Sequence, residues 1–158
     1  TYIKKAFPVL SFAFTSRTSA GTLPLTVHAL EKDFGISKGI ANLSASFGVS
    51  IGQNGCAGIY PAMLAVMIAP SVGVDPFTAS FLVKLVIVTA IGSLGIAGVG
   101  GGATFAALVV LSTMGLPVEL VGLLIAIEPL IDMGRTALNV NDAMVTALLT
   151  ARLQHKQH

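Results

Sequence analysis

GVSIGQNGCAG, residues 48–58, interrupts a long apolar segment at its centre and decides the fold. The segment around it, 39–70, exceeds the roughly 20 residues that a helix needs to cross a bilayer. Its glycines and its two side-chain amides, Gln53 and Asn54, are poor material for a helix that faces lipid. Unwound backbone is tolerated at that depth only where protein buries it or where it lines a cavity. We therefore predict a discontinuous transmembrane helix over 39–70.

The composition excludes an ordinary soluble domain. Hydrophobic residues make up 54% of the 158 residues and charged residues 10%, whereas soluble domains carry about a quarter charged residues. Between Gly39 and Val118 the only charged side chains are Asp75 and Lys84, so lipid or a larger membrane protein must cover this stretch. The net charge is only +2, with no basic patch and no tryptophan, so we expect no nucleic-acid partner. The single cysteine, Cys56, can form no internal disulfide.

Two further apolar segments are broken at their middles. Segment 5–33 is interrupted by the hydroxyl-rich TSRTSAGT, residues 15–22. Each of its arms is shorter than the roughly 20 residues of a span, which predicts a re-entrant helical hairpin. Segment 75–115 runs from 77 to 97, meets GVGGG at 98–102 and continues into a second short arm. A second re-entrant hairpin is the better interpretation, and two full spans joined by a tight loop are the alternative.

The last segment, 117–153, is predicted to be one helix with a polar face. Its polar side chains recur at spacings of three or four residues and so share one side: Asp132, Arg135, Thr136, Asn139, Asp142 and Thr146. The order of hairpin followed by interrupted or polar helix occurs twice, as in transporters with a binding site at the membrane midplane. Because the chain opens in mid-stream, we expect it to be the C-terminal part of a longer carrier.

Asp132 and Arg135 are the strongest sign of a binding site. A charge at the bilayer centre costs at least about 2.5–3.5 kcal/mol, so such residues usually face a cavity and act there. A carboxylate accepts from an ammonium, and a guanidinium donates to a carboxylate through two parallel bonds. This combination suits an amino acid. The alternative is a structural pair, since an acid and a base three residues apart can satisfy each other.

The two hairpin tips would complement that pair. Half-helices that meet at Ser19-Ala20-Gly21 and at Val99-Gly100-Gly101 would point free N–H groups and positive dipole ends at a carboxylate. For the second tip, a plain flexible loop is the alternative. Neutral oxygen donors near the breaks could hold a dehydrated sodium ion, or they could satisfy one another between helices. They are Ser50, Gln53, Asn54 and Ser93.

Four motifs in this order resemble the dicarboxylate/amino acid:cation symporters, the family of the glutamate transporters. They are TSRTSAGTLPLT (15–26), IGQNGCAG (51–58), GIAGVGGGATF (95–105) and DMGRTALNV (132–140). The resemblance implies an all-α integral membrane fold in which the chain forms the C-terminal transport domain, without the N-terminal scaffold helices. The implied parts are helical hairpin one (5–33), transmembrane helix seven (39–70), helical hairpin two (75–115) and transmembrane helix eight (117–153).

Within the family, GQNGCAG followed by YPAML, at 52–64, is most similar to the bacterial L-cystine symporters. The resemblance implies uptake of an amino acid, most simply L-cystine, coupled to a cation gradient by elevator-type movement. It also implies a multi-pass protein of the bacterial inner membrane, surrounded by lipid and trimeric at full length, with no organic cofactor. Symport of a dicarboxylate or of another amino acid is the nearer alternative. A structural or channel-forming membrane protein is the alternative of a different class.

The resemblance also implies roles for individual residues. Asp132 would bind the substrate ammonium, while Asn139 and the backbone at Ser19 would hold the α-carboxylate. Arg135 and Thr136 would address the distal end of the substrate, in a pocket lined by Cys56 and Val99. The implied sodium ligands are Gly48, Ser50, Gln53, Asn54, Ser93 and Asn139.

The chain departs from the family's usual ion ligands. Gly52 stands where a sodium-binding asparagine is usual, and the neutral Asn54 stands in place of a carboxylate. Ala143 aligns with another ligand carboxylate, and Asp142 comes one residue earlier. Since a helix turns about 100° per residue, Asp142 need not reach the same place. Sodium and a proton both remain open as the coupling ion.

Overall fold

The computed structural model describes residues 1–98 and 100–155, and within them every regular element is helical. The all-α prediction is therefore confirmed. The α-helices are α1 (Tyr2–Ser16), α2 (Ser19–Lys32), α3 (Lys38–Ser50), α4 (Tyr60–Ile68), α5 (Ala79–Ser93), α6 (Gly102–Met114), α7 (Glu119–Leu124) and α8 (Glu128–His155). A π-helical turn, η1 (Asn54–Ile59), and a 3₁₀ turn, η2 (Ala69–Val72), flank α4.

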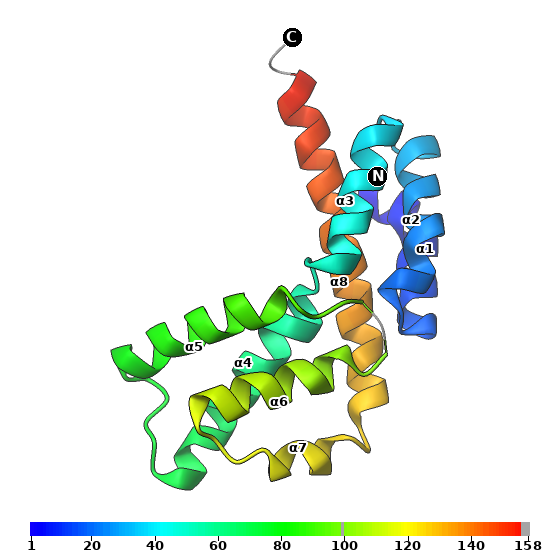
Figure 1. The fold of residues 1–158 in the computed structure, drawn as a ribbon. Helices are drawn as coiled ribbons and strands as arrows, with labels where there is room; N and C mark the ends of the chain where they lie inside the picture. Colours follow the sequence, from blue (N-terminus) through cyan, green and yellow to red (C-terminus); the bar gives the residue numbers. More distant parts are fainter. Residues whose placement is uncertain (99, 156–158) are drawn as a thin grey trace.

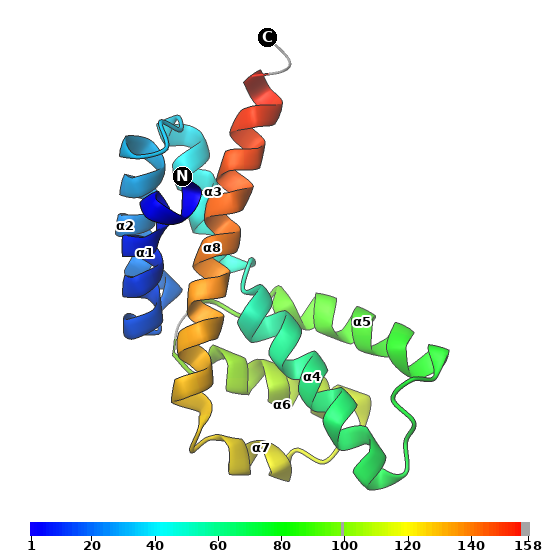
Figure 2. The ribbon, with the colours of Figure 1, turned by 180° about the vertical axis from the view of Figure 1, so that it is seen from behind.

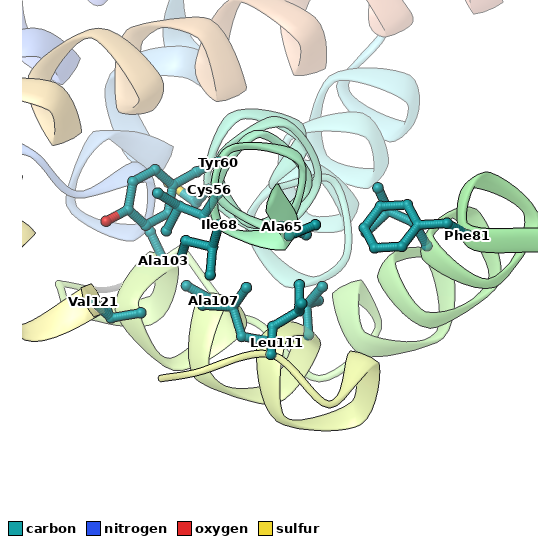
Figure 3. Packing of buried hydrophobic residues seen from close by; sticks show 14 residues of the cluster. Cys56, Tyr60, Ala65, Ile68, Phe81, Ala103, Ala107, Leu111 and Val121 are labelled. Atoms are coloured by element: carbon teal, nitrogen blue, oxygen red, sulfur yellow. The ribbon is translucent and has the colours of Figure 1, made fainter. Parts of the chain in front are cut away.

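Helix α8 is the long axis on which the other elements pack. Figures 1 and 2 show α1, α2 and α3 along its C-terminal half and α4 to α7 around its N-terminal half. Each group buries its own apolar cluster. The first group buries Ala6, Val9, Ala13, Ala29, Leu30, Ile36 and Ala41 against Val140, Met144 and Ala147 of α8. The second is centred on α4, with Cys56 and Tyr60 at one end and Phe81 at the other (Figure 3).

The break between α1 and α2 is narrower than the hydroxyl-rich stretch that predicted it. Helix α1 ends at Ser16, and Arg17 adopts a left-handed conformation with φ 54°, a common way for a helix to end. Thr18 is extended and caps α2, its hydroxyl oxygen accepting from the backbone N–H of Gly21 at 3.1 Å. A threonine at this position suits an N-cap because its side chain replaces a missing backbone acceptor.

The interruption of the central segment falls within the glycine-rich stretch. Helix α3 ends at Ser50, residues 51–53 are not helical, and the chain resumes as the π-helical turn η1 before α4. Taken as one run, Lys38–Val72 is the helical segment long and apolar enough to cross a membrane among the residues that the structure describes. Helices α5 and α6 are apolar but shorter.

Two expected boundaries differ from the structure. The arm expected to reach residue 97 ends at Ser93, ahead of a loop that contains Gly95 and Gly98, because glycine destabilises a helix by about 1 kcal/mol relative to alanine. The single helix expected over 117–153 is wrong, since residues 119–124 form the separate helix α7 and α8 begins at Glu128. Pro129 explains the split, because proline lacks an N–H and clashes with the carbonyl four residues before it.

Candidate functional site

The candidate site lies where the two groups of helices meet on α8. Asp132, Arg135, Thr136 and Asn139 are all buried on one face of that helix, with between 1% and 8% of their surface exposed. The rest of the predicted stripe leaves this interior, since Asp142 is half-buried and Thr146 is exposed. The buried polar face therefore covers two helical turns, opposite the break between α3 and α4.

Gln53 connects three segments at the centre of the site. Its side chain is 3% exposed. Its amide nitrogen donates to the carbonyl of Gly48 at 2.7 Å, and its oxygen accepts from Asn139 Nδ2 at 2.9 Å and from Ser19 Oγ at 3.3 Å. A buried amide with its donor and acceptor both paired stabilises one arrangement of its neighbours. Gln53 therefore links α2, the α3 break and α8.

Asn139 joins α8 to the π-helical turn. Its Oδ1 accepts from the backbone N–H of Gly55 at 2.7 Å, and its Nδ2 also contacts Cys56 Sγ at 3.2 Å. A Cβ added to Gly55 would lie 3.0 Å from the Arg135 carbonyl oxygen and 3.1 Å from Asn139 Oδ1. Glycine at this position thus permits the close approach of η1 to α8.

Within the part of the chain that the structure describes, the contacts of Asp132 are all long. Its Oδ1 lies 3.5 Å from Thr136 Oγ1, 3.5 Å from Arg135 Nη2 and 3.9 Å from Cys56 Sγ. Strong hydrogen bonds to a carboxylate are about 2.5–2.9 Å long. The Asp132 carboxylate is therefore buried but weakly paired, and it can accept from a further donor.

Arg135 has more donors than partners. One nitrogen, Nη2, forms an ion pair with Glu128. This ion pair was not predicted from the sequence. The guanidinium carbon lies 4.2 Å from the centre of the Tyr60 ring, a cation–π distance. Nε and Nη1 are buried without a hydrogen-bond partner among the described residues, and so is the Tyr60 hydroxyl. Buried unpaired donors are costly, and these groups are free to donate to or accept from a further group.

The loop between α5 and α6 reaches the site through Gly98. The Gly98 N–H donates to the carbonyl of Val49 at 2.8 Å, and its carbonyl accepts from the N–H of Ala20 at 3.1 Å and from the Thr18 hydroxyl at 3.4 Å. This brings the two predicted tips together. Val99, which was predicted to line the pocket, lies outside the described residues.

The predicted ion ligands fall into two groups. Gly48, Gln53 and Asn139 are together, but their polar groups bond to one another and a Gln53 N–H occupies the Gly48 carbonyl. An N–H at that place repels a cation, so these three residues do not fit sodium in this arrangement. Ser50, Asn54 and Ser93 lie further out: both serine hydroxyls donate to carbonyls of their own helices, and Asn54 Nδ2 donates to Asp142 Oδ2 at 3.0 Å. The assignment of Ser50, Asn54 and Ser93 to a sodium site stays a prediction.

Neither Tyr60 nor Glu128 was among the site residues predicted from the sequence. Tyr60 follows Cys56 by four residues, one helical turn, and its place in an otherwise aliphatic segment is the signal that could have found it. Glu128 precedes Arg135 by seven residues, two turns of the same helix. Both residues contact the Arg135 guanidinium.

Comparison with known proteins gives the chain its family. Residues 1–153 match the model of the sodium:dicarboxylate symporter family. The chain is 65% identical over 151 residues to the L-cystine uptake protein TcyP of Bacillus thuringiensis (strain Al Hakam), covering 96% of this chain and 32% of that protein. It is 64% identical over 153 residues to the L-cystine uptake protein TcyP of Shouchella clausii (strain KSM-K16), covering 97% and 33% respectively.

An uncharacterized symporter of Haemophilus influenzae (strain ATCC 51907 / DSM 11121 / KW20 / Rd) is 65% identical over 155 residues, which cover 98% of this chain and 35% of that protein. The chain thus spans about a third of the length of these relatives. With a family match that covers nearly all of its residues, the chain belongs to the sodium:dicarboxylate symporter family, whose members are membrane transporters and not enzymes.

Proposed function

We propose that the full-length protein takes up L-cystine by secondary active symport with a cation across the bacterial inner membrane. The observation that carries the proposal is Arg135, a buried guanidinium with two unpaired nitrogens, three residues from the weakly paired carboxylate of Asp132. Together they offer a donor for a carboxylate and an acceptor for an ammonium. The uptake proteins that share 64–65% identity with this chain are named for L-cystine.

In this proposal the polar face of α8 binds one amino-acid head and begins the pocket for the other. Asp132 accepts from the α-ammonium. The Asn139 amide gives up its contact with the Cys56 sulfur and donates to the α-carboxylate instead. The backbone N–H of Ser19, at the start of α2, donates to the same carboxylate. Arg135 and Thr136 extend toward the distal head, with Cys56 beside it.

Binding requires the site to open. The proposed substrate-binding side chains of α8, Asp132, Arg135, Thr136 and Asn139, are only 1–8% exposed, so cystine cannot reach them in this arrangement. Cystine therefore enters after the α5–α6 loop, which closes the site through Gly98, moves away. We assign α1–α2 and α5–α6 to two re-entrant hairpins, and the whole chain to the mobile transport domain of an elevator-type trimer.

The coupling cation is proposed from the family description, which names sodium. A proton is the alternative, because Asn54 and Ala143 are neutral where the resemblance expects carboxylates. Uptake of labelled cystine by the full-length protein in liposomes, with and without a sodium gradient, separates the two. Equal uptake in both conditions excludes sodium as the coupling ion.

The test of the substrate site is the variant Arg135→Ala in the full-length protein. It removes the proposed donor, so the distal carboxylate of the bound substrate would be buried without its partner, a loss that typically costs about 2–5 kcal/mol of binding energy. We expect cystine affinity to fall by at least about thirtyfold, since each 1.4 kcal/mol is a factor of ten. Arg152→Ala is the matched control, because Arg152 is exposed on the same helix. Unchanged affinity for Arg135→Ala would contradict the assignment.

A dicarboxylate or another amino acid is the second candidate substrate, favoured by the same free guanidinium donors. Competition of labelled cystine uptake by unlabelled aspartate and glutamate decides between them. Inhibition by aspartate at concentrations at which unlabelled cystine does not inhibit would reject cystine as the main substrate.

A further inference from the structure

We propose that Glu128 is a specificity-determining residue that binds the distal ammonium group of the substrate and disfavours substrates whose distal end carries only a carboxylate. The inference rests on the proposed cystine transport and extends it to the far end of the same site. Nothing in the family description or in the names of the relatives assigns this residue a role.

The argument begins with the charges of the substrate. Cystine carries an ammonium and a carboxylate at each end, four charged groups in all. The site proposed above provides Asp132 for one ammonium, Asn139 with the Ser19 N–H for one carboxylate, and Arg135 for the second carboxylate. The second ammonium has no counterpart, and burying an ammonium without an opposite charge is strongly unfavourable.

Glu128 is the carboxylate placed to fill that gap. It begins α8, and its side chain is 13% exposed. The ion pair with Arg135 puts it beside the residue proposed to hold the distal carboxylate, so an acid and a base lie next to each other as the two charges of an amino-acid head do. Among the described residues, the hydrogen bond of Glu128 uses Oε1 alone. An ionised carboxylate has about four acceptor positions, so Glu128 can accept from an ammonium while it keeps Arg135.

The charge balance at this end of the site supports the same conclusion. Glu128, Asp132 and Arg135 together carry a formal charge of −1. A distal group with a carboxylate alone would add a second negative charge beside Glu128 and compete with it for Arg135. A distal zwitterion adds no net charge and pairs with both residues. Tyr60, whose ring lies under the guanidinium and whose hydroxyl has no partner among the described residues, limits where Arg135 can move in response.

The experiment compares two ligands on the full-length protein. Labelled L-cystine is displaced either by unlabelled L-cystine or by the mixed disulfide of L-cysteine with 3-mercaptopropionate, which keeps the distal carboxylate and lacks the distal ammonium. The wild type is expected to bind cystine at least about tenfold more tightly than this analogue, since the distal carboxylate of the analogue would lie beside Glu128 without an ammonium to balance the two negative charges. Equal binding by the wild type overturns the proposal, and this comparison does not depend on how any variant folds.

Glu128→Gln then assigns the preference to the residue. We expect it to weaken cystine binding by at least about tenfold, to leave the analogue unchanged or bound more tightly, and so to remove the preference. Glu119→Gln, the same substitution at an exposed position in α7, should leave both affinities unchanged. Equal weakening of cystine and the analogue by Glu128→Gln would overturn the proposal, because it would show that Glu128 only orients Arg135.

Failure of this inference is distinguishable from failure of the proposed function. A wild type that binds and transports cystine but does not discriminate against the analogue rejects the role of Glu128 alone. A wild type that binds no cystine rejects both. Glu128→Asp, which keeps the carboxylate, is expected to retain at least part of the preference.

Discussion

The two hairpin-like pairs of helices, α1–α2 and α5–α6, meet at one place but are held there by different means (Figure 1). The α1–α2 turn is fixed by its own side chains: the Thr18 hydroxyl caps Gly21, the Thr22 hydroxyl donates to the Thr18 carbonyl at 2.8 Å, and Ser19 reaches Gln53. The α5–α6 loop is held in the site by the backbone of Gly98. The first tip is thus built by its own sequence, and the second is positioned by the first.

Burial differs between α2 and α5, while α6 buries as many residues as α2 does. Helix α2 buries Ser19, Thr22, Thr26, Ala29 and Leu30, whereas the buried residues of α5 are Phe81 and Leu85. Large apolar side chains of α5 such as Ile91 and Val86 are 67% exposed and would face lipid or further helices in the full-length protein. The α5–α6 loop is held by the three hydrogen bonds of Gly98, each of which contributes about 0.5–1.5 kcal/mol net. Moving the α1–α2 turn would break its own hydrogen bonds and also expose the buried residues of α2, so we expect the α5–α6 loop to leave the site at the lower cost.

Among the variants that test this comparison, Gln53→Leu is expected to lower the stability of the protein most. It removes the side chain that ties Ser19 and Asn139 to the α3 break and takes a hydrogen-bond partner from the buried Ser19 hydroxyl, the half-buried Gly48 carbonyl and the buried Asn139 amide, which keeps its contact with Cys56. A buried polar group without a partner costs about 1–3 kcal/mol, so we expect the full-length protein to lose at least about 1 kcal/mol of stability, measured as a lower unfolding midpoint in detergent. Gln154→Leu, at an exposed position of α8, should change little. Equal midpoints for the two variants would show that Gln53 does not hold the tips together.

Gly98→Ala should have the next largest effect, and on the second tip alone. A Cβ at this position would lie 2.7 Å from Ser19 Cβ and 3.0 Å from Gln53 Cδ, which is too close for the loop to stay docked. Such overpacking costs about 1–3 kcal/mol. We expect faster maleimide labelling of Cys56, whose peptide can be followed by mass spectrometry, because Cys56 is only 7% exposed when the site is closed.

Gly100→Ala provides the control for that measurement, because a Cβ there meets nothing within 4 Å. Its Cys56 labelling rate should equal that of the wild type. If Gly98→Ala also labels at the wild-type rate, the loop accommodates the methyl group without leaving the site, and the proposed weakness of the second tip is wrong.

The same contrast explains how far the sequence could predict the molecule. The break at 48–58 and the hydroxyl-rich turn at 15–22 were predictable because glycine and N-cap chemistry act over a few residues. The buried face of Asp132, Arg135, Thr136 and Asn139 was predictable from helical periodicity. These features depend on local sequence alone.

The contacts between segments were not predictable in the same way. Gln53 was considered as an ion ligand, and its actual partners lie 34 and 86 residues away along the chain. Gly98 lies in a glycine run that is equally typical of a flexible loop, and only its docking on Val49 and Ala20 gives it a role. The extra helix α7 was missed because the apolar pattern continues across residues 119–127 without a polar break. Tertiary contacts decide each of these points.

Substitutions at the N-cap residues of α2 and α5 are expected to have the smallest effect on stability, and they compare the two helix pairs directly. Thr18 caps α2 through its side chain, whereas Thr78, the N-cap residue of α5, makes no side-chain capping bond. Thr18→Ala should therefore cost about 1 kcal/mol, the usual value of an N-cap, and Thr78→Ala should stay within about 0.5 kcal/mol, as surface substitutions do. The unfolding midpoints of the full-length variants in detergent measure both.

The pair of variants also distinguishes two explanations of the first tip's stability. If capping holds the α1–α2 turn, Thr18→Ser, which keeps the hydroxyl that accepts from Gly21 at 3.1 Å, recovers most of the loss. The alternative is that the Thr18 methyl group stabilises the turn by packing against Gly21, where an added Cβ would lie only 2.7 Å from it. In that case Thr18→Ser is as destabilised as Thr18→Ala. Only the first result supports a turn built by its own hydrogen bonds, because methyl packing would instead make the turn depend on the fit of the Thr18 side chain against Gly21.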